Sequence, residues 1–575
     1  MTHQEICAMM VNGAKIYLEY LQKHSDKGDK HYEINECKVE KKFKDSVRLG
    51  LSLNEENPEN KKLISSIKKG KIEHTLVFVK ATDNDPQPIQ VIFQCKITQK
   101  DKVFVDISLD TFEKYKYIFA NNLYQHINIS VDFRWLISAV QRFYQESETF
   151  NRQKVVLGAS DIIDTPSWFS KEQVRALKLT IQSPMCYIWG APGTGKTKAI
   201  LVHSVLHQLE HKRRVLIIAP TNDAVDNAMS AVINNYKSEF LEELPFLRLG
   251  NATQKFEEMF PKLCVGNLTD EEREQKRGNV LCYGCTSAYF MLNYSAFGNI
   301  DHIFVDEAAY CSLPHGLIIY TMSKQLTMLG DHKQLGPVFD YNLTIEDGNS
   351  DICVFDHSML YVNNILNSRK EEFVSQYFKM RKQNGYPIIK GSRIQPLLTS
   401  YRYGSTLAGA LDSLIYERIG LKGASGIGTL IKWLPSTYKG GDKKRTNISE
   451  ANKALAFAQT IEKHKTIAII TPYVNQALLI KDCYFSQKSR RYIDFINTIH
   501  KAQGKEFDVV IVSVVDKCPQ TGYYTNSNDA NALTCINTAV SRAKKELVII
   551  ADNTWQYQEG QLISELIKIA TKVEL

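Results

Sequence analysis

Residues 190–197 read GAPGTGKT and fit the pattern G-x-x-x-x-G-K-[ST] at every fixed position. The apolar run MCYIWG (185–190) precedes them, and KAILVHSVLHQL (198–209), which has the spacing of an amphipathic helix, follows. In such a strand–loop–helix unit the glycines let backbone N–H groups point inward around a phosphate, and the helix dipole adds positive potential. The sequence therefore predicts a nucleotide-phosphate loop, made of Gly190, Ala191, Pro192, Gly193, Thr194, Gly195, Lys196 and Thr197.

Two side chains of this loop and two carboxylates further along the chain predict the chemistry. Lys196 is expected to reach the terminal phosphates, and Thr197 to offer its hydroxyl to Mg²⁺. Asp306 and Glu307 end the apolar strand in IFVDEAA (303–309), where Asp306 can hold the Mg²⁺ shell and Glu307 can orient or deprotonate a water. A carboxylate beside the Mg²⁺ aspartate favours ATP hydrolysis over transfer to a substrate hydroxyl, because a kinase must keep water out.

A second set of polar residues points to the γ-phosphate. The strand in LGDHKQLGPV (329–338) places Asp331 and Gln334 beside it, and Gln334 is a candidate sensor of its presence. In-line cleavage also needs positive charge over the transition state. Arg402 in LLTSYRYG and Arg542 in INTAVSRAK are the two candidates, although from spacing alone each is more often a solvated or ion-paired side chain.

Apolar strands alternate with helical segments from about residue 170 onward. Such strands, with small or acidic residues at their carboxyl ends, are typical of parallel sheets covered by helices. They fall into two groups, before about 335 and after about 465, which predicts two α/β domains. The expected boundaries are 1–165 for an N-terminal part, 166–338 for the first α/β domain, with a short helical insertion at about 250–279, and 339–575 for the second. The N-terminal part reads as a helix, a small β-domain at about 70–115 and a second helix at 131–150.

Composition limits the class of protein. The 575 residues carry a net charge of +8, a mild excess that is compatible with a polyanionic partner. No apolar run reaches the roughly 18 residues of a membrane span, and the N-terminus lacks the pattern of a signal peptide. We therefore expect a cytoplasmic or nuclear protein with no membrane partner.

Nine segments in order resemble one family, the superfamily 1 helicases of group B, in particular the up-frameshift, senataxin and immunoglobulin-mu-binding branch. They are KEQVRALKLTIQSPMCYIWGAPGTGKT, APTNDAVDNAM, GCTS, VDEAA, GDHKQLGPV, SYRYG, TPYVNQ, TIHKAQGKEFD and NTAVSRAK, spread over about 170–550. The resemblance implies two RecA-like motor domains behind a small β-barrel-like domain on helical stalks. It implies an ATP-dependent helicase that acts on single-stranded RNA or DNA, with movement in the 5′→3′ direction.

The resemblance also implies roles for single residues of the ATP site. Gln173 matches a glutamine that reads the adenine edge, and Tyr401 an aromatic residue that packs on the base. Arg402 matches a γ-phosphate arginine and Arg542 the arginine finger. A loop that couples nucleotide to nucleic acid is matched by Gly504 and Glu506. Ser400 departs from the family pattern, which usually has glutamine there, so one γ-phosphate contact is expected to be weaker.

For the nucleic-acid path, the resemblance implies small polar groups at the ends of strands, which suit contacts to phosphate and sugar without reading the sequence. These residues are Pro220, Thr221, Asn222, Thr286, Thr471, Tyr473, Thr498 and His500. They permit RNA or DNA, because that choice depends on contacts to 2′-hydroxyls. Protein partners are expected at the N-terminal domain.

Two other functions remain open at this stage. One is an ATP-gated clamp that grips single strands and recruits partners with little unwinding. The other is an ATPase that works without nucleic acid. The complete hydrolytic set (Lys196, Asp306, Glu307, Gln334 and Arg542) favours the motor over the clamp. An ATPase without a strand would leave APTND (219–223) and TIHKAQG (498–504) without a purpose.

Overall fold

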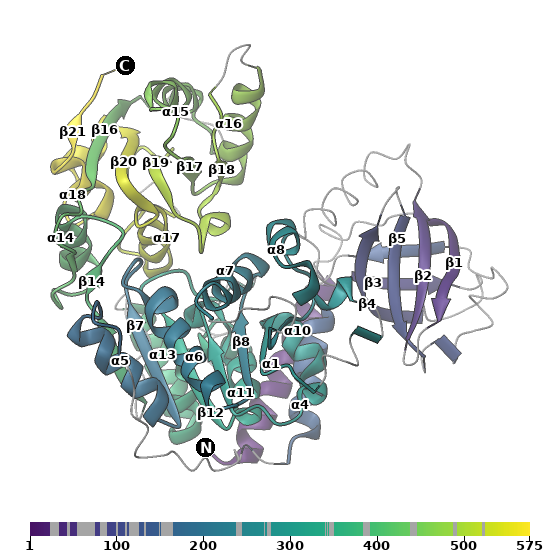
Figure 1. The fold of residues 1–575 in the computed structure, drawn as a ribbon. Helices are drawn as coiled ribbons and strands as arrows, with labels where there is room; N and C mark the ends of the chain where they lie inside the picture. Colours follow the sequence, from purple (N-terminus) through teal and green to yellow (C-terminus); the bar gives the residue numbers. More distant parts are fainter. Residues whose placement is uncertain are drawn as a thin grey trace.

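The computed structural model contains two α/β domains, one above the other in Figure 1, and an antiparallel β-domain beside the lower one. It describes residues 1–23, 34–42, 46–53, 75–80, 89–98, 102–109, 112–113, 126–130, 134–148, 150, 165–236, 244–268, 271–272, 278–337, 339, 341, 343, 350–382, 392–437, 445–486, 491–519 and 524–574. Among these residues no helix is both long enough and apolar enough to cross a bilayer.

The first α/β domain is built on a seven-stranded parallel sheet in the order β13-β7-β12-β11-β8-β10-β9. Its strands are β7 (Met185–Gly190), β8 (Val215–Ala219), β9 (Phe246–Arg248), β10 (Cys282–Thr286), β11 (His302–Val305), β12 (Gln325–Gly330) and β13 (Arg393–Leu397). Successive side chains of β8 enter two different cores: Val215 and Ile217 lie on one face, and Leu216 and Ile218 on the other. Burial on both faces explains why these strands are apolar throughout.

Helices cover both faces of this sheet. On one face lie α5 (Lys171–Gln182), the π-helical turn η2 (Lys196–Leu201) with α6 (Val202–Glu210), and α7 (Asn222–Ile233). On the other face lie α10 (Ser287–Asn293), α11 (Leu313–Met322), α12 (Val362–Asn367) and α13 (Lys370–Lys382). The predicted insertion holds one short helix, α8 (Gln254–Met259), in its described part.

The boundary predicted at residue 338 is wrong, because the first domain extends to Leu397. Strand β13 pairs in parallel with β7, so it is an edge of the first sheet. Ile352, Met359 and Phe373 are buried in the same core as α11. The sequence did not reveal this because residues 339–397 lack a long apolar strand, and only pairing in space assigns β13 to its sheet.

The second α/β domain contains a six-stranded parallel sheet in the order β18-β17-β19-β20-β16-β21. Its strands are β16 (Leu430–Ser436), β17 (Ile467–Thr471), β18 (Phe495–Thr498), β19 (Phe507–Ser513), β20 (Ala543–Asp552) and β21 (Thr571–Lys572). Its helices are α14 (Ser405–Leu414), α15 (Ile448–Thr460), α16 (Val474–Ser486), α17 (Ala530–Val540) and α18 (Leu562–Lys568), and a short pair, β14 (Thr399–Ser400) with β15 (Lys422–Gly423), stands at its start. The prediction of two parallel-sheet α/β domains is confirmed.

The N-terminal part divides between two bodies. Helices α1 (His3–Lys23) and α4 (Arg134–Glu146) pack into the core of the first α/β domain, where Asn12 Nδ2 donates to Asp351 Oδ2 at 2.8 Å and the Tyr144 hydroxyl donates to the Pro314 carbonyl at 2.6 Å. The strands form an antiparallel sheet in the order β1-β2-β5-β4-β3-β6, with its edge strands β1 and β6 also in contact. They are β1 (Ile34–Lys42), β2 (Ser46–Leu53), β3 (Thr75–Lys80), β4 (Ile89–Thr98), β5 (Lys102–Ser108) and β6 (His126–Ser130), a wider range than the predicted 70–115.

Candidate active site between the two α/β domains

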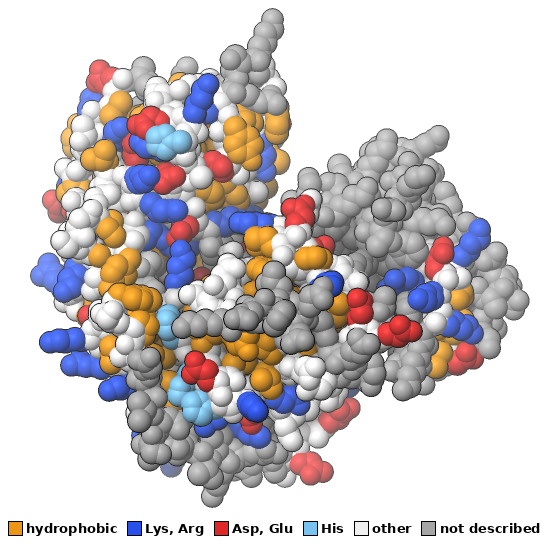
Figure 2. All heavy atoms as spheres, viewed as in Figure 1, with side chains coloured by type: hydrophobic (Ala, Val, Ile, Leu, Met, Phe, Trp, Pro, Cys, Tyr) orange, Lys and Arg blue, Asp and Glu red, His pale blue; other side chains and the backbone are white. Residues whose placement is uncertain are grey.

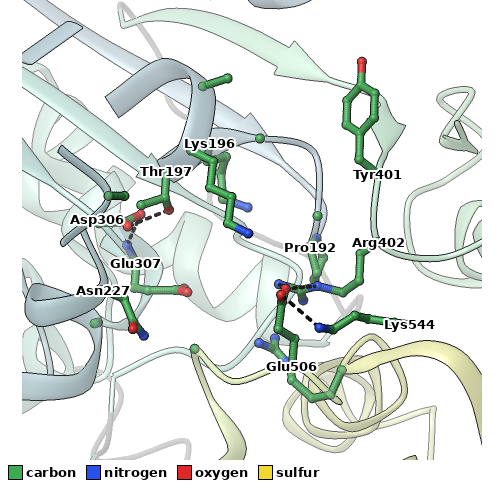
Figure 3. Close-up of a pocket in the computed structure, with 18 of the residues that line it drawn as sticks. Pro192, Lys196, Thr197, Asn227, Asp306, Glu307, Tyr401, Arg402, Glu506 and Lys544 are labelled. Atoms are coloured by element: carbon green, nitrogen blue, oxygen red, sulfur yellow. Dashed lines mark hydrogen bonds and ion pairs between the residues drawn. The ribbon is translucent and has the colours of Figure 1, made fainter. Parts of the chain in front are cut away.

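A cavity of about 650 Å³ opens at the carboxyl edge of the first sheet, and both α/β domains line it (Figure 3). Fourteen predicted residues contribute to its wall: Gln173, Pro192, Gly193, Gly195, Lys196, Thr197, Asp306, Glu307, Gln334, Tyr401, Arg402, Gly504, Glu506 and Arg542. Gly190, Ala191 and Thr194 belong to the same loop but do not line the cavity, and Ala191 and Thr194 are buried behind it. Its size is that of a site for a ligand as large as a nucleotide.

The phosphate loop depends on two glycines with left-handed backbone. Gly193 has φ +79° and Gly195 has φ +93°, a region that L-residues rarely adopt. A Cβ at Gly193 would lie 2.3 Å from Cβ of Arg402, and one at Gly195 would lie 2.7 Å from Nε2 of Gln173. The Tyr401 N–H donates to the Gly193 carbonyl at 2.8 Å. The glycines therefore let residues 401–402 and Gln173 approach the loop backbone.

Lys196 follows the loop at the first position of the π-helical turn η2. Its ammonium donates to the carbonyls of Gly190 at 2.5 Å and Ala191 at 3.3 Å. Burial lowers the pKa of Lys196, and the carboxylates of Asp331, Glu307 and Asp306 oppose that shift without cancelling it. This lysine is therefore held at the phosphate loop and faces a cluster of carboxylates.

Thr197, Asp306 and Glu307 converge on one side of the cavity (Figure 3). The Thr197 hydroxyl donates to Asp306 Oδ2 at 2.8 Å, and the Glu307 N–H donates to Asp306 Oδ1 at 3.0 Å. Burial and the neighbouring Glu307 raise the pKa of Asp306 to about 6. An oxygen pair of this kind, next to a phosphate loop, fits Mg²⁺, which takes few protein ligands and completes its shell with phosphate oxygens and water. Among the described residues no cluster of three acidic, histidine or cysteine side chains competes for a metal ion.

Gln334 and Arg542 meet across the domain boundary. Arg542, two residues after the end of α17, donates from Nη2 to Gln334 Oε1 at 2.5 Å, and Gln334 Nε2 donates to Asp331 Oδ2 at 2.9 Å. Arg542 is 2% exposed, and its Nε donates to the Thr538 carbonyl at 2.8 Å. Burial and the nearby Arg402 lower the pKa of Arg542 to about 10, which leaves the guanidinium charged at neutral pH.

Arg402 lies opposite Glu506, and sequence reasoning missed the lysine beside them. Arg402 Nη2 and Glu506 Oε2 are 3.0 Å apart, and Lys544 Nζ lies 3.4 Å from Glu506 Oε1 (Figure 3). Burial would raise the pKa of Glu506, but Arg402, Lys544 and Lys198 reverse that shift, and the pKa is lowered. The sequence did contain one indication that Lys544 is near the site, since it stands two residues after Arg542.

Gln173 lines the cavity next to the phosphate loop, and an aromatic residue that sequence reasoning also missed lines the same cavity. Gln173 is part of a capping box with Ser170, the N-cap of α5, and its Nε2 donates to the Thr194 carbonyl at 3.4 Å. One N–H and one acceptor lone pair of its amide remain for a ligand. Trp168 lines the same cavity and is 62% exposed, an unusual state for a residue of this size.

The predicted nucleic-acid residues lie at, or just after, the carboxyl ends of four strands, β8, β10, β17 and β18. Thr221, Pro220 and His500 reach the surface at least in part, whereas Thr471 is fully buried and Tyr473 is 7% exposed. The side chain of Thr471 is therefore not available to a strand in this arrangement. Thr286 and Thr498 are also mostly buried, and Thr286 caps α10 through a hydrogen bond from the Tyr289 N–H at 3.2 Å.

Asn222 is engaged inside the first domain. Its Oδ1 accepts from Nη2 of Arg248 at 2.6 Å, and the Arg248 Nε lies 2.6 Å from Asp226 Oδ1. Arg248 is fully buried on β9, and Asp226 Oδ2 accepts from the N–H of Thr253, the N-cap of α8. Asn222 thus links α7 to Arg248 of β9, and Asp226 links α7 to the insertion, roles that the sequence did not indicate.

A phosphate loop, a paired carboxylate and two arginines lie at the boundary of two parallel-sheet domains, the arrangement expected of a P-loop nucleotide-binding site between tandem RecA-like domains. Residues 169–289 and 431–554 each match a sequence family described as "AAA domain". The DNA replication ATP-dependent helicase/nuclease DNA2 of Gallus gallus is 27% identical over 66% of this chain and 36% of its own length.

Two further relatives are named as an RNA helicase and as a regulator of nonsense transcripts. RNA helicase Mov10l1 of Mus musculus is 26% identical over 64% of this chain and 32% of its own length. The regulator of nonsense transcripts 1 of Dictyostelium discoideum is 22% identical over 67% of this chain and 31% of its own length. The chain spans about a third of the length of these relatives. These matches support the predicted resemblance to the superfamily 1 helicases of the up-frameshift and senataxin-like branch.

Proposed function

We propose that this protein hydrolyses ATP in the cleft between its two α/β domains and uses the cycle to move along single-stranded RNA or DNA, unwinding duplexes or displacing bound proteins. The hydrogen bond from Arg542 to Gln334, made across the domain boundary inside the cavity, carries the proposal. Because each domain supplies part of the site, a bound ATP would draw the two domains together, and its hydrolysis would let them separate.

In the proposed site, Lys196 binds the terminal phosphates, and Thr197 and Asp306 hold Mg²⁺, which neutralises phosphate charge. Glu307 activates the attacking water, and Gln334 detects the γ-phosphate. Arg402 and Arg542 stabilise charge in the transition state. Gln173 and Tyr401 bind the adenine, and Gly504 with Glu506 links the site to the strand.

For the strand, we propose the carboxyl edges of both sheets, where Pro220, Thr221 and His500 are accessible. Lys and Arg side chains (blue) gather on the second domain where it borders the first in Figure 2, as expected for a partner with a phosphate backbone. Movement in the 5′→3′ direction and a cytoplasmic or nuclear location are further parts of the proposal, supported by the resemblance to superfamily 1 group B helicases.

The test is ATP hydrolysis by the purified chain, alone and with single-stranded RNA or DNA of matched sequence. We expect stimulation by a strand, and a difference between the two polymers would identify the substrate. Lys196→Ala is the control and should abolish turnover. A low rate that no strand changes, combined with tight ATP-dependent strand binding, would support the clamp instead.

A further inference from the structure

One buried polar cluster crosses the domain boundary behind the nucleotide cavity, around Asp331. Tyr416, which follows α14 in the second domain, donates its hydroxyl to Asp331 Oδ2 at 2.6 Å. Asp331 also accepts from Trp189 Nε1 at 3.2 Å, from the Lys333 N–H at 3.0 Å and from Gln334 Nε2 at 2.9 Å. Asp331 is 1% exposed, so four donors from two domains share one buried carboxylate.

Helix α17 of the second domain closes this cluster. Asn537 Nδ2 donates to the Lys333 carbonyl at 2.7 Å and to the Tyr416 hydroxyl oxygen at 3.1 Å. One residue further, the Thr538 hydroxyl oxygen accepts from the Leu335 N–H at 3.3 Å. Leu335 also packs in the apolar core of the second domain. Residues 331–335 of the first domain therefore pack against the second domain and form hydrogen bonds with it.

The cluster is continuous with the groups that face the γ-phosphate. Gln334 accepts from Arg542 and donates to Asp331, which in turn accepts from Tyr416. The Tyr416 hydroxyl is thus linked to the Arg542 guanidinium through two side chains, although Tyr416 does not line the cavity. A buried chain of hydrogen bonds of this kind restricts the orientation of each member.

We propose that Tyr416 is a positioning residue for ATP hydrolysis: its hydroxyl, acting through Asp331, couples the two domains and orients Gln334 and Arg542 over the γ-phosphate. The inference rests on the proposed function. A group that orients a transition-state contact affects binding of the transition state more than binding of the product nucleotide. This difference separates positioning from general stabilisation of the fold.

The chain offers a matched control in Tyr403. Both tyrosines are buried in the same core, with exposures of 1% for Tyr416 and 0% for Tyr403. Within the described residues the Tyr403 hydroxyl makes no hydrogen bond to Asp331, and the polar side chain next to it is that of Ser400. Substitution of either residue by phenylalanine keeps the ring and removes one hydroxyl, so only Tyr416→Phe breaks the link to Asp331.

The experiment compares Tyr416→Phe and Tyr403→Phe with the parent chain in strand-stimulated ATP hydrolysis and in binding of ADP and of ADP with aluminium fluoride. For Tyr416→Phe we expect kcat and the affinity for the fluoride complex to fall about tenfold, with ADP affinity within about twofold of the parent. Tyr403→Phe should match the parent in all three. In an Asp331→Asn background, Tyr416→Phe should cause little further loss, because its partner is already altered.

Parent-like kcat and fluoride-complex affinity in Tyr416→Phe would overturn the inference. So would an equal loss of ADP and fluoride-complex affinity, which would make Tyr416 a structural residue. If the parent chain hydrolyses no ATP with or without a strand, the proposed function fails, and the ratio of the two nucleotide affinities still decides the role of Tyr416.

Discussion

Glu307 stands out at the scale of the residue because of its backbone. Its φ is +52°, in the left-handed region that non-glycine residues seldom occupy. Its N–H is held by Asp306 Oδ1, and its side chain lines the cavity. Backbone strain of this kind is common at functional sites, where it fixes the direction of a side chain. Here it directs the Glu307 carboxylate towards the proposed position of the attacking water.

Glu307→Gln tests this assignment with little change in size. A glutamine cannot take a proton from water, so we expect ATP to bind while turnover falls by roughly 10²–10⁴-fold, the range for loss of a general base. The variant should then hold a strand tightly in the presence of ATP. Steady-state hydrolysis and strand affinity with and without ATP provide the measurement. Hydrolysis at the parent rate would show that another group activates the water.

Ser400 shows how a residue that departs from the family pattern is used. Its hydroxyl donates to the Pro192 carbonyl at 3.0 Å and accepts from the Arg402 N–H at 3.3 Å. The serine thus fixes the phosphate loop to the second domain through backbone groups. The prediction that Ser400 makes a weaker γ-phosphate contact than the glutamine usual in the family remains a prediction.

At the scale of the element, the turn after β19 is strained and held by a buried acid. Val515 has φ +72°, an outlier for a β-branched residue, and its N–H donates to Glu450 Oε2 at 2.9 Å. Glu450, in α15, also accepts from the hydroxyls of Ser436 at 3.0 Å and Ser513 at 2.7 Å. The next residue, Asp516, accepts from the Tyr473 hydroxyl at 2.6 Å. Glu450 therefore supports the turn that orients Tyr473.

Burial raises the pKa of Glu450 from its ordinary 4.5 to about 7, despite these hydrogen bonds. The folded protein then holds a proton that the unfolded chain has lost between these two pH values. The contribution of Glu450 to the free energy of unfolding is therefore greatest below about pH 4.5. It decreases as the pH rises to about 7, by on the order of 3 kcal/mol in total. This loss applies to the second domain.

Glu450→Gln should remove that pH dependence, because glutamine is neutral throughout. The measurement is the midpoint of thermal unfolding from pH 5 to pH 8. As a control, Glu462→Gln alters an exposed acid of the same domain and should keep the parent profile. An unchanged profile in Glu450→Gln would assign the pH dependence to other groups.

At the scale of the whole molecule, two ion pairs join the two domains. Lys333 Nζ lies 2.6 Å from Glu417 Oε1, and Lys505 Nζ lies 2.8 Å from Asp223 Oδ2. The second pair connects α7, beside the proposed strand path, with the loop that contains Gly504 and Glu506. A nucleotide in the cavity and a nucleic-acid strand in the proposed path would therefore both affect the boundary between the two α/β domains.

Strand binding should weaken as salt rises, because phosphate contacts release condensed counterions. For single strands the slope of log affinity against log salt is about −0.7 per phosphate neutralised. The measurement is strand affinity across a salt series, and a peptide nucleic acid of the same base sequence, which has no phosphates, is the control and should bind far more weakly. Affinity that is independent of salt would argue against contacts to the backbone.

The sequence by itself determined the phosphate loop, the acid pair at 306–307, the two parallel-sheet domains and the candidate arginines, because each depends on local chemistry. Loop and strand patterns depend on neighbours in the chain, so they can be read in one dimension. Only the tertiary structure decided that β13 belongs to the first sheet, that Thr471 and Asn222 face inward, and that Lys544 and Trp168 border the cavity. It also brought Tyr416 to Asp331, 85 positions apart in the chain. Contacts of that kind arise from the packing of two domains, which no local pattern encodes.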